Sequence, residues 1–172
     1  MTRVVGVWLG LGLLGAAAAA QAGPALKIGY INGTQVLQQT PGYTAAESTF
    51  DRAVQGYRGE VQKLAAQLDS AVRAFDQQSI ALSPAAKQAK QKQLQTMQQH
   101  LTDRQNELQQ QAQTRQQELM QPIYARIKAV IQGLRAEGNY ALIVDADSPG
   151  IMAADPSLDL TSKVLQRLKQ SQ

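Results

Sequence analysis

A sustained heptad repeat constrains the fold of this chain more than any other feature. From Phe50 the apolar positions advance by alternating steps of four and three residues, with charged and amide residues between them. A globular helix usually carries a wider apolar stripe, so this narrow seam predicts a long helix that packs on one or two partner helices. The seam residues are Phe50, Val54, Tyr57, Val61, Leu64, Leu68, Ala71 and Phe75.

The seam stops at a turn signal near residues 80–84. Ser83 is a good N-cap and Pro84 suits the first position of a helix, so a second helix is expected to begin there. A short turn between two seams predicts an antiparallel coiled-coil hairpin, an arm of residues 44–121. The apolar positions of its second helix are Leu94, Met97, Leu101, Leu108 and Leu119.

An antiparallel hairpin predicts which residues of its two helices face each other. If the chain folds back near residue 82, facing residues have numbers that sum to about 165. Phe50 then faces Arg115, which is tolerable if the Arg stem packs while its head reaches water. Apolar residues meet at five layers, which pair Ala71 with Leu94, Leu68 with Met97, Leu64 with Leu101, Tyr57 with Leu108, and Ala46 with Leu119.

Two segments, 23–43 and 122–172, are expected to form a small β body from which the arm projects. Pro122 is expected to kink the second helix where the arm meets the body, and Gly138 to end it. Beyond Pro122 the apolar residues follow the wider stripe of a helix packed on a body. These residues are Ile123, Ile127, Val130, Ile131 and Leu134.

Short β-branched runs predict the strands of this body. One run is 26–31 and another is 140–144, and 151–153 is a possible third strand after the turn at 148–150. Asp159 is expected to cap a final amphipathic helix. The fold class is therefore mainly α with a small β body. Because such a thin sheet leaves open edges and a small core, self-association is expected.

The first 22 residues have the pattern of a secretory signal peptide. Arg3 precedes an apolar stretch, and small residues at positions 20 and 22 predict cleavage after Ala22. An uncleaved membrane anchor is the alternative, but the second half of the stretch is only mildly apolar. We therefore expect an exported or periplasmic protein with no stable membrane insertion after cleavage.

Composition argues against several function classes. The chain has no cysteine and a single histidine, His100, in a polar helical stretch, so no metal site or cofactor is expected. The formal charge of +4 is mild, and basic residues do not form the concentrated face of a nucleic-acid binder. Asp145, Asp147 and Asp155 could in principle act as acids or bind a cation, but turn and capping roles explain them. No enzyme is expected.

The tip of the hairpin is a candidate contact surface for other chains. Apolar residues exposed by the turn lie near cations there, which could attract non-native or acidic segments. A solvated basic turn with a local hydrophobic clasp explains the same residues. The candidates are Phe75, Ile80, Leu82, Lys87, Lys90 and Lys92.

The order of these features resembles the Skp (OmpH) family of periplasmic chaperones. The resemblance rests on the signal peptide, the segment 27–32, the polar hairpin, the segment 138–146 and the closing segment 159–168. It implies a homotrimer whose strands form a small β-barrel, with three hairpins around a cavity that holds unfolded outer-membrane proteins without ATP. Residues implied in the body strands are Ile28, Tyr30, Leu142 and Val144.

One feature departs from the family. The arm is rich in Gln and mildly basic, whereas the best-known members are strongly basic, so no lipopolysaccharide-contacting residue is carried over. Two functions therefore compete: an ATP-independent holdase for unfolded envelope proteins, and a non-enzymatic coiled-coil spacer or adaptor of the cell envelope. A docking hairpin of the second kind should carry another apolar stripe on its outer face, and the sequence shows none.

Overall fold

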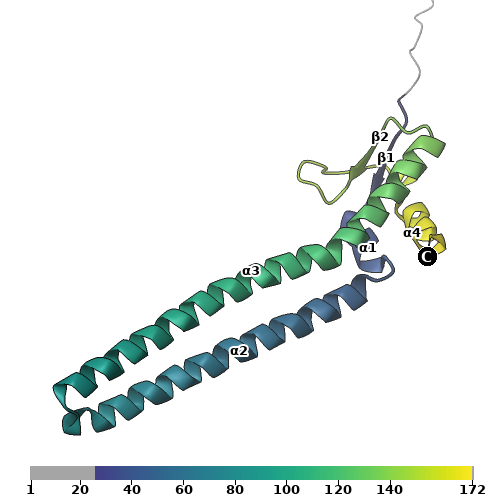
Figure 1. Ribbon diagram of the computed structural model, residues 1–172. Helices are drawn as coiled ribbons and strands as arrows, with labels where there is room; N and C mark the ends of the chain where they lie inside the picture. Colours follow the sequence, from purple (N-terminus) through teal and green to yellow (C-terminus); the bar gives the residue numbers. More distant parts are fainter. Residues whose placement is uncertain (1–25, 172) are drawn as a thin grey trace, which may run out of the picture.

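A helical hairpin projects from a small body in the computed structural model, which describes residues 26–171 (Figure 1). Helix α2 spans Tyr43–Gln78, 36 residues, and α3 spans Pro84–Glu137, 54 residues. The two run side by side and are joined by a single 3₁₀ turn at Ser79–Ala81. The predicted fold class, mainly α with a long hairpin and a small β body, is confirmed.

The turn uses the chemistry that the sequence suggests. The Ser83 hydroxyl accepts a hydrogen bond from the Ala86 backbone N–H at 3.3 Å, and Pro84 is the first residue of α3. Proline fits there because the first helical N–H has no partner within the helix. The chain therefore reverses within a few residues and starts α3 at once.

The seam is only half-buried, because each arm helix has a single neighbour. Every seam residue from Phe50 to Phe75 is of intermediate exposure, and the fully buried arm residues are Ala46, Leu101 and Leu108. Glu60 and Arg104 form an ion pair across the hairpin, and their numbers add to one less than the expected 165. This pair agrees with the predicted register, as does the groove that Tyr57 and Leu108 line together.

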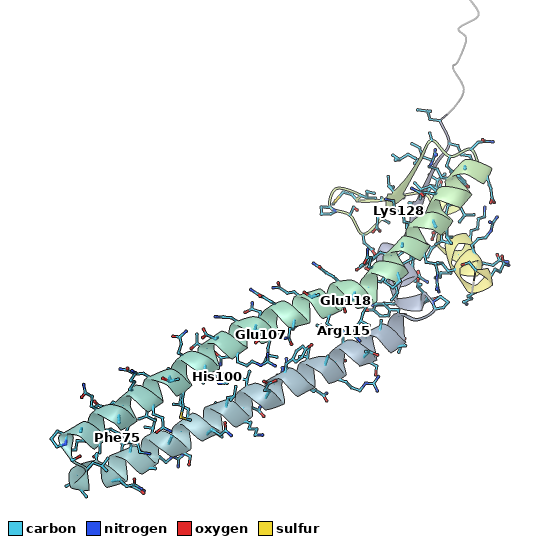
Figure 2. All side chains as sticks on the ribbon, in the orientation of Figure 1. Phe75, His100, Glu107, Arg115, Glu118 and Lys128 are labelled. Carbon is cyan, nitrogen blue, oxygen red and sulfur yellow. The ribbon has the colours of Figure 1, made fainter. Side chains whose placement is uncertain are left out.

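Helix α3 bends where the arm meets the body. Figure 2 shows the change of direction between Glu118 and Lys128, and Pro122 lies inside the helix in that interval. Proline removes one backbone hydrogen bond and its ring crowds the preceding turn, which kinks a helix without ending it. The expected kink is present, and α3 continues to Glu137 as one element.

The body contains a two-stranded parallel sheet. Strand β1 (Ile28–Ile31) pairs with β2 (Leu142–Asp145), and α1 (Gly33–Gln39) and α4 (Thr161–Gln170) complete this part of the molecule. Partly buried residues from the end of α3 pack against a core drawn from both ends of the chain. The buried core is Ile31, Val36, Leu160, Val164, Leu165 and Leu168.

The prediction of a possible third strand at residues 151–153 is wrong. Residues 151–153 form no strand, and instead Asp159 makes an isolated parallel bridge with Tyr30, where the Leu160 N–H donates to the Tyr30 carbonyl at 2.8 Å. The reason is that turns follow β2 directly, and Asp145 and Asp147 bond to the start of α1. The chain therefore leaves the plane of the sheet before residue 151.

Two helix ends differ slightly from expectation. Gly138 ends α3 with φ −87°, and Asn139 takes the left-handed conformation with φ 51°. Asn tolerates this conformation better than most residues. At α4 the cap position is Leu160 rather than Asp159, although the Asp159 carboxylate accepts from the Thr161 N–H at 2.8 Å.

Residues 1–22, the predicted signal peptide with its cleavage after Ala22, lie outside the described residues.

Candidate functional site

The three acidic candidates have structural partners. Asp145 accepts from the Gly33 N–H at 2.9 Å and Asp147 from the Thr34 N–H at 2.8 Å, so both cap the first turn of α1. Asp155 accepts from the Ser157 N–H at 2.9 Å, and this bond lowers the pKa of the Asp155 carboxyl. These contacts match the turn and capping roles that the sequence suggests.

Metal-binding geometry is absent from residues 26–171. No group of three or more carboxylates or imidazoles converges there in a way that could hold an ion. His100 lies exposed on α3, midway along the arm in Figure 2. The structure presents four surfaces to other molecules: the two flanks of the arm, its tip and one face of the body.

The first flank of the arm is apolar. We call it the apolar flank and define it by Val54, Tyr57, Val61, Leu108 and Ala112, which line an open groove of about 390 Å³ between α2 and α3. Leu108 is buried, and the other seam residues here remain partly exposed. Three polar residues also line the groove, and they are Arg58, Gln62 and Gln109, all exposed.

The opposite flank is charged. Tyr57 lies between the two, because it also lines a groove whose other residues all come from α3 and are polar or charged. On this side the Arg104 Nε donates to Glu60 Oε1 at 2.6 Å, and a second guanidinium nitrogen lies 2.6 Å from Glu107. We call this side the charged flank; its residues are Glu60, Arg104, Glu107, Arg115 and Glu118.

The ion cluster on the charged flank shifts the pKa values of its members. The hydrogen bonds from Arg104 lower the pKa of the Glu60 carboxyl, and those to Glu60 and Glu107 raise the pKa of the Arg104 guanidinium. Arg115, predicted opposite Phe50, bonds to Glu118 at 3.1 Å. The ion pair between Glu60 and Arg104 therefore links α2 to α3 on this flank, near the middle of the arm.

At the tip of the arm the candidate residues separate into two groups. Phe75, Leu82 and Lys90 line one small cavity of about 70 Å³ between the helices. Ile80 is 92% exposed on the turn, and Lys92 is exposed on α3, while Lys87 is half-buried. Figure 2 labels Phe75 at this far end of the arm.

The four body candidates share one face of the sheet. Ile28 pairs with Leu142 and Tyr30 with Val144, so their side chains alternate to the same side, away from the Ile31 core. Ile28 is 43% exposed and Leu142 is 51% exposed. The face of the sheet that carries Ile28 and Leu142 is therefore open to solvent. An apolar pocket of about 500 Å³ opens between α1, α3 and the sheet; Ile31 and Ile143 line it from the core side of the sheet, and Val144 also contributes.

Sequence reasoning missed the contacts that join distant parts of the chain. Examples are the Glu60–Arg104 pair, the bond from Lys27 Nζ to the Gly138 carbonyl at 2.9 Å, and the Arg167–Glu137 pair that ties α4 to α3. The Glu60–Arg104 pair could have been predicted from the expected register, because that register places residue 60 opposite residue 105, next to Arg104. The others depend on the orientation of the body elements, which carries no local signal.

Comparison with known proteins gives one consistent relationship. The family model "Outer membrane protein (OmpH-like)" matches residues 27–168. The chaperone protein Skp of Yersinia enterocolitica is 24% identical over 163 residues, which cover 94% of this chain and 98% of that protein.

A solved structure has the same fold. A crystal structure from Caulobacter crescentus CB15, described as an outer membrane chaperone (OmpH-like), superposes with a TM-score of 0.72. The two chains are 17% identical, and the match covers 87% of this chain and 88% of the other. The similarity includes the arm as well as the body, because it spans nearly the whole of each chain.

Proposed function

This chain belongs to the OmpH-like family, and from that membership we propose that it is an ATP-independent holdase chaperone. It binds unfolded outer-membrane or envelope proteins between helical arms and prevents their aggregation. The observation that carries the proposal is the arm: a long hairpin whose seam is only half-buried along α2. Such an arm offers many weak apolar contacts and no pocket shaped for one ligand.

Weak contacts suit a protein that must hold a client and then release it. Exposed apolar positions each contribute little, and long Gln side chains adapt to different neighbours. Several arms acting together raise the effective concentration of contacts, so the client is retained without any single strong site. Release needs no ATP, because folding of the client elsewhere removes the unfolded form from the equilibrium.

The body assembles three copies of the chain in this proposal. The sheet face of Ile28, Tyr30, Leu142 and Val144 is the trimer contact, and the exposure of Ile28 and Leu142 supports that role. An exposed apolar patch of this kind marks a protein–protein contact. Three arms would then project from one body and enclose the client.

The site of action is the periplasm or another exported compartment. The signal-like segment, with cleavage after Ala22, supports export. Across residues 26–171 no helix is both long and apolar enough to cross a bilayer. The proposal includes no catalysis, no nucleic-acid partner and no cofactor. The tip residues Ile80, Lys87 and Lys92 are secondary client contacts.

A light-scattering assay tests the function. Dilution of a urea-denatured outer-membrane β-barrel protein into buffer makes it aggregate, and a molar excess of the mature chain is expected to suppress the scattering. Addition of ATP should not change the result. If scattering is unaffected at excess, the holdase fails and the alternative, a coiled-coil spacer or adaptor of the envelope, is favoured.

A further inference from the structure

The two flanks of the arm differ enough to ask which of them meets the client. On the apolar flank Val54, Val61 and Leu108 are among the residues that line the groove, and Arg58 is the only charged residue that lines it. On the charged flank, three ion-paired residues span the hairpin at the same level, at Glu60, Arg104 and Glu107. The arm is therefore asymmetric about Tyr57.

Because of this asymmetry, binding of a client to the two flanks differs in free energy. Covering the apolar flank removes apolar surface from water, which is favourable by ~25 cal/mol per Å². Covering the charged flank would strip water from carboxylates and a guanidinium that already satisfy one another, and a new neighbour offers them little in return. Contact through the apolar flank is thus favoured.

We propose that the client is held through the apolar flank, as an extended segment whose apolar side chains enter the groove and whose carboxylate meets Arg58. The inference rests on the proposed function and assigns the contact to one side of the arm. Arg58 is exposed, and among residues 26–171 no carboxylate forms an ion pair with it, so its charge is available to a partner.

The size of the groove fits such a segment better than a second copy of the chain. A stable interface between folded proteins takes roughly 20–30 residues from each partner. A groove of about 390 Å³ lined by eight residues holds only a few side chains. Short apolar runs of an unfolded chain can fill it, one after another, and leave again.

Cross-linking at matched positions tests the assignment. Because the chain has no cysteine, single Gln62→Cys and Gln110→Cys variants can each carry a benzophenone label. Both glutamines are exposed; the first lines the apolar flank and the second lines the groove on the opposite side. With a urea-denatured β-barrel protein as client, we expect roughly tenfold more cross-linked client from residue 62.

Charge reversal supplies the second measurement. Arg58→Glu should weaken client binding roughly fivefold, whereas Lys63→Glu, the same charge change outside the groove, should leave it unchanged. Helix content and melting temperature, measured by circular dichroism, show that each variant is folded. Equal losses from both variants would mean that overall charge, and not Arg58, attracts the client.

The outcomes separate the inference from the function it rests on. Equal or reversed labelling at residues 62 and 110, with aggregation still suppressed, overturns the inference alone. Cross-links between copies of the chain at residue 62 in the absence of client assign the groove to self-association and overturn it too. If the unlabelled chain does not suppress aggregation, the result contradicts both the proposed holdase function and the proposed client groove.

Discussion

Gly33 shows how closely α1 and β2 approach one another. A Cβ atom at this position would collide with the Asp145 carboxylate, which accepts a hydrogen bond from the Gly33 N–H at 2.9 Å and another from the Asp147 N–H at 3.0 Å. The carboxylate cannot move aside without losing these bonds. The absence of a side chain at residue 33 therefore allows β2 to cap α1.

A pair of glycine substitutions tests this contact. Gly33→Ala should lower the free energy of unfolding by about 1–3 kcal/mol, because the added Cβ displaces the part-buried Asp145 carboxylate and the Gly33 N–H loses its acceptor. Gly59→Ala is the matched control: its Cβ would meet nothing within 4 Å on helix α2, and alanine there should stabilise by ~0.5–1 kcal/mol. Urea unfolding measures both. Equal effects of the same sign would contradict the packing at Gly33.

Glu60 predicts a pH dependence of the arm. Because Arg104 lowers the pKa of Glu60 from its ordinary 4.5, the pair stabilises the folded arm above that pH, and the contribution is lost as the pH falls through the lowered pKa. Glu60→Gln should therefore lower the melting temperature at neutral pH, and the difference from wild type should shrink below pH 4.5.

The control for this pH dependence is another exposed carboxylate on α2. Glu47→Gln removes a charge that forms no ion pair within the described chain, so its effect should be smaller and should not follow the same pH profile. Thermal unfolding followed by circular dichroism at a series of pH values gives both curves. Parallel curves for the two variants would show that the Glu60–Arg104 pair does not form in solution.

Among the elements, the hairpin was the most predictable from sequence. Spacing of three and four residues reports directly on which face of a helix is apolar, and Ser83-Pro84 marks a helix start by local chemistry alone. The bend at Pro122 follows from the missing N–H of proline. Each of these signals lies within a few residues of the feature it predicts.

A cysteine pair tests the register of these elements. Leu64→Cys with Leu101→Cys should form a disulfide under mild oxidation, because the two residues sum to 165 and Leu101 is buried between the helices. Leu64→Cys with Gln105→Cys, one turn further along α3, is the control and should remain reduced. A disulfide in the control pair alone would mean that the helices are paired one turn out of register.

The sheet was less predictable than the hairpin. Short β-branched runs identify β1 and β2 but carry no information on whether they run parallel, and the distance between them in sequence leaves both directions open. The apolar run at 151–153 resembles a strand locally, yet no strand pairs with it. Asp159 pairs with Tyr30 instead, although its sequence context suggested only a helix cap.

At the scale of the whole molecule, the apolar surface left open on the body is the main feature that a single chain does not explain. Ile28 and Leu142 are exposed on the sheet face, and Met152 on the following loop is 95% exposed. Sequence could name the strand residues, but the pairing that brings Ile28 and Leu142 to one exposed face needed the structure. The division of the arm into two flanks also needed the three-dimensional register.

Sedimentation of the mature chain with and without an unfolded client tests the central claim most directly. The chain alone should sediment with three times its own mass, and addition of a urea-denatured β-barrel protein should give a soluble complex that contains the client and three chains. A chain that stays monomeric, or a client that pellets while the chain remains behind in solution, would contradict a holdase built from three arms.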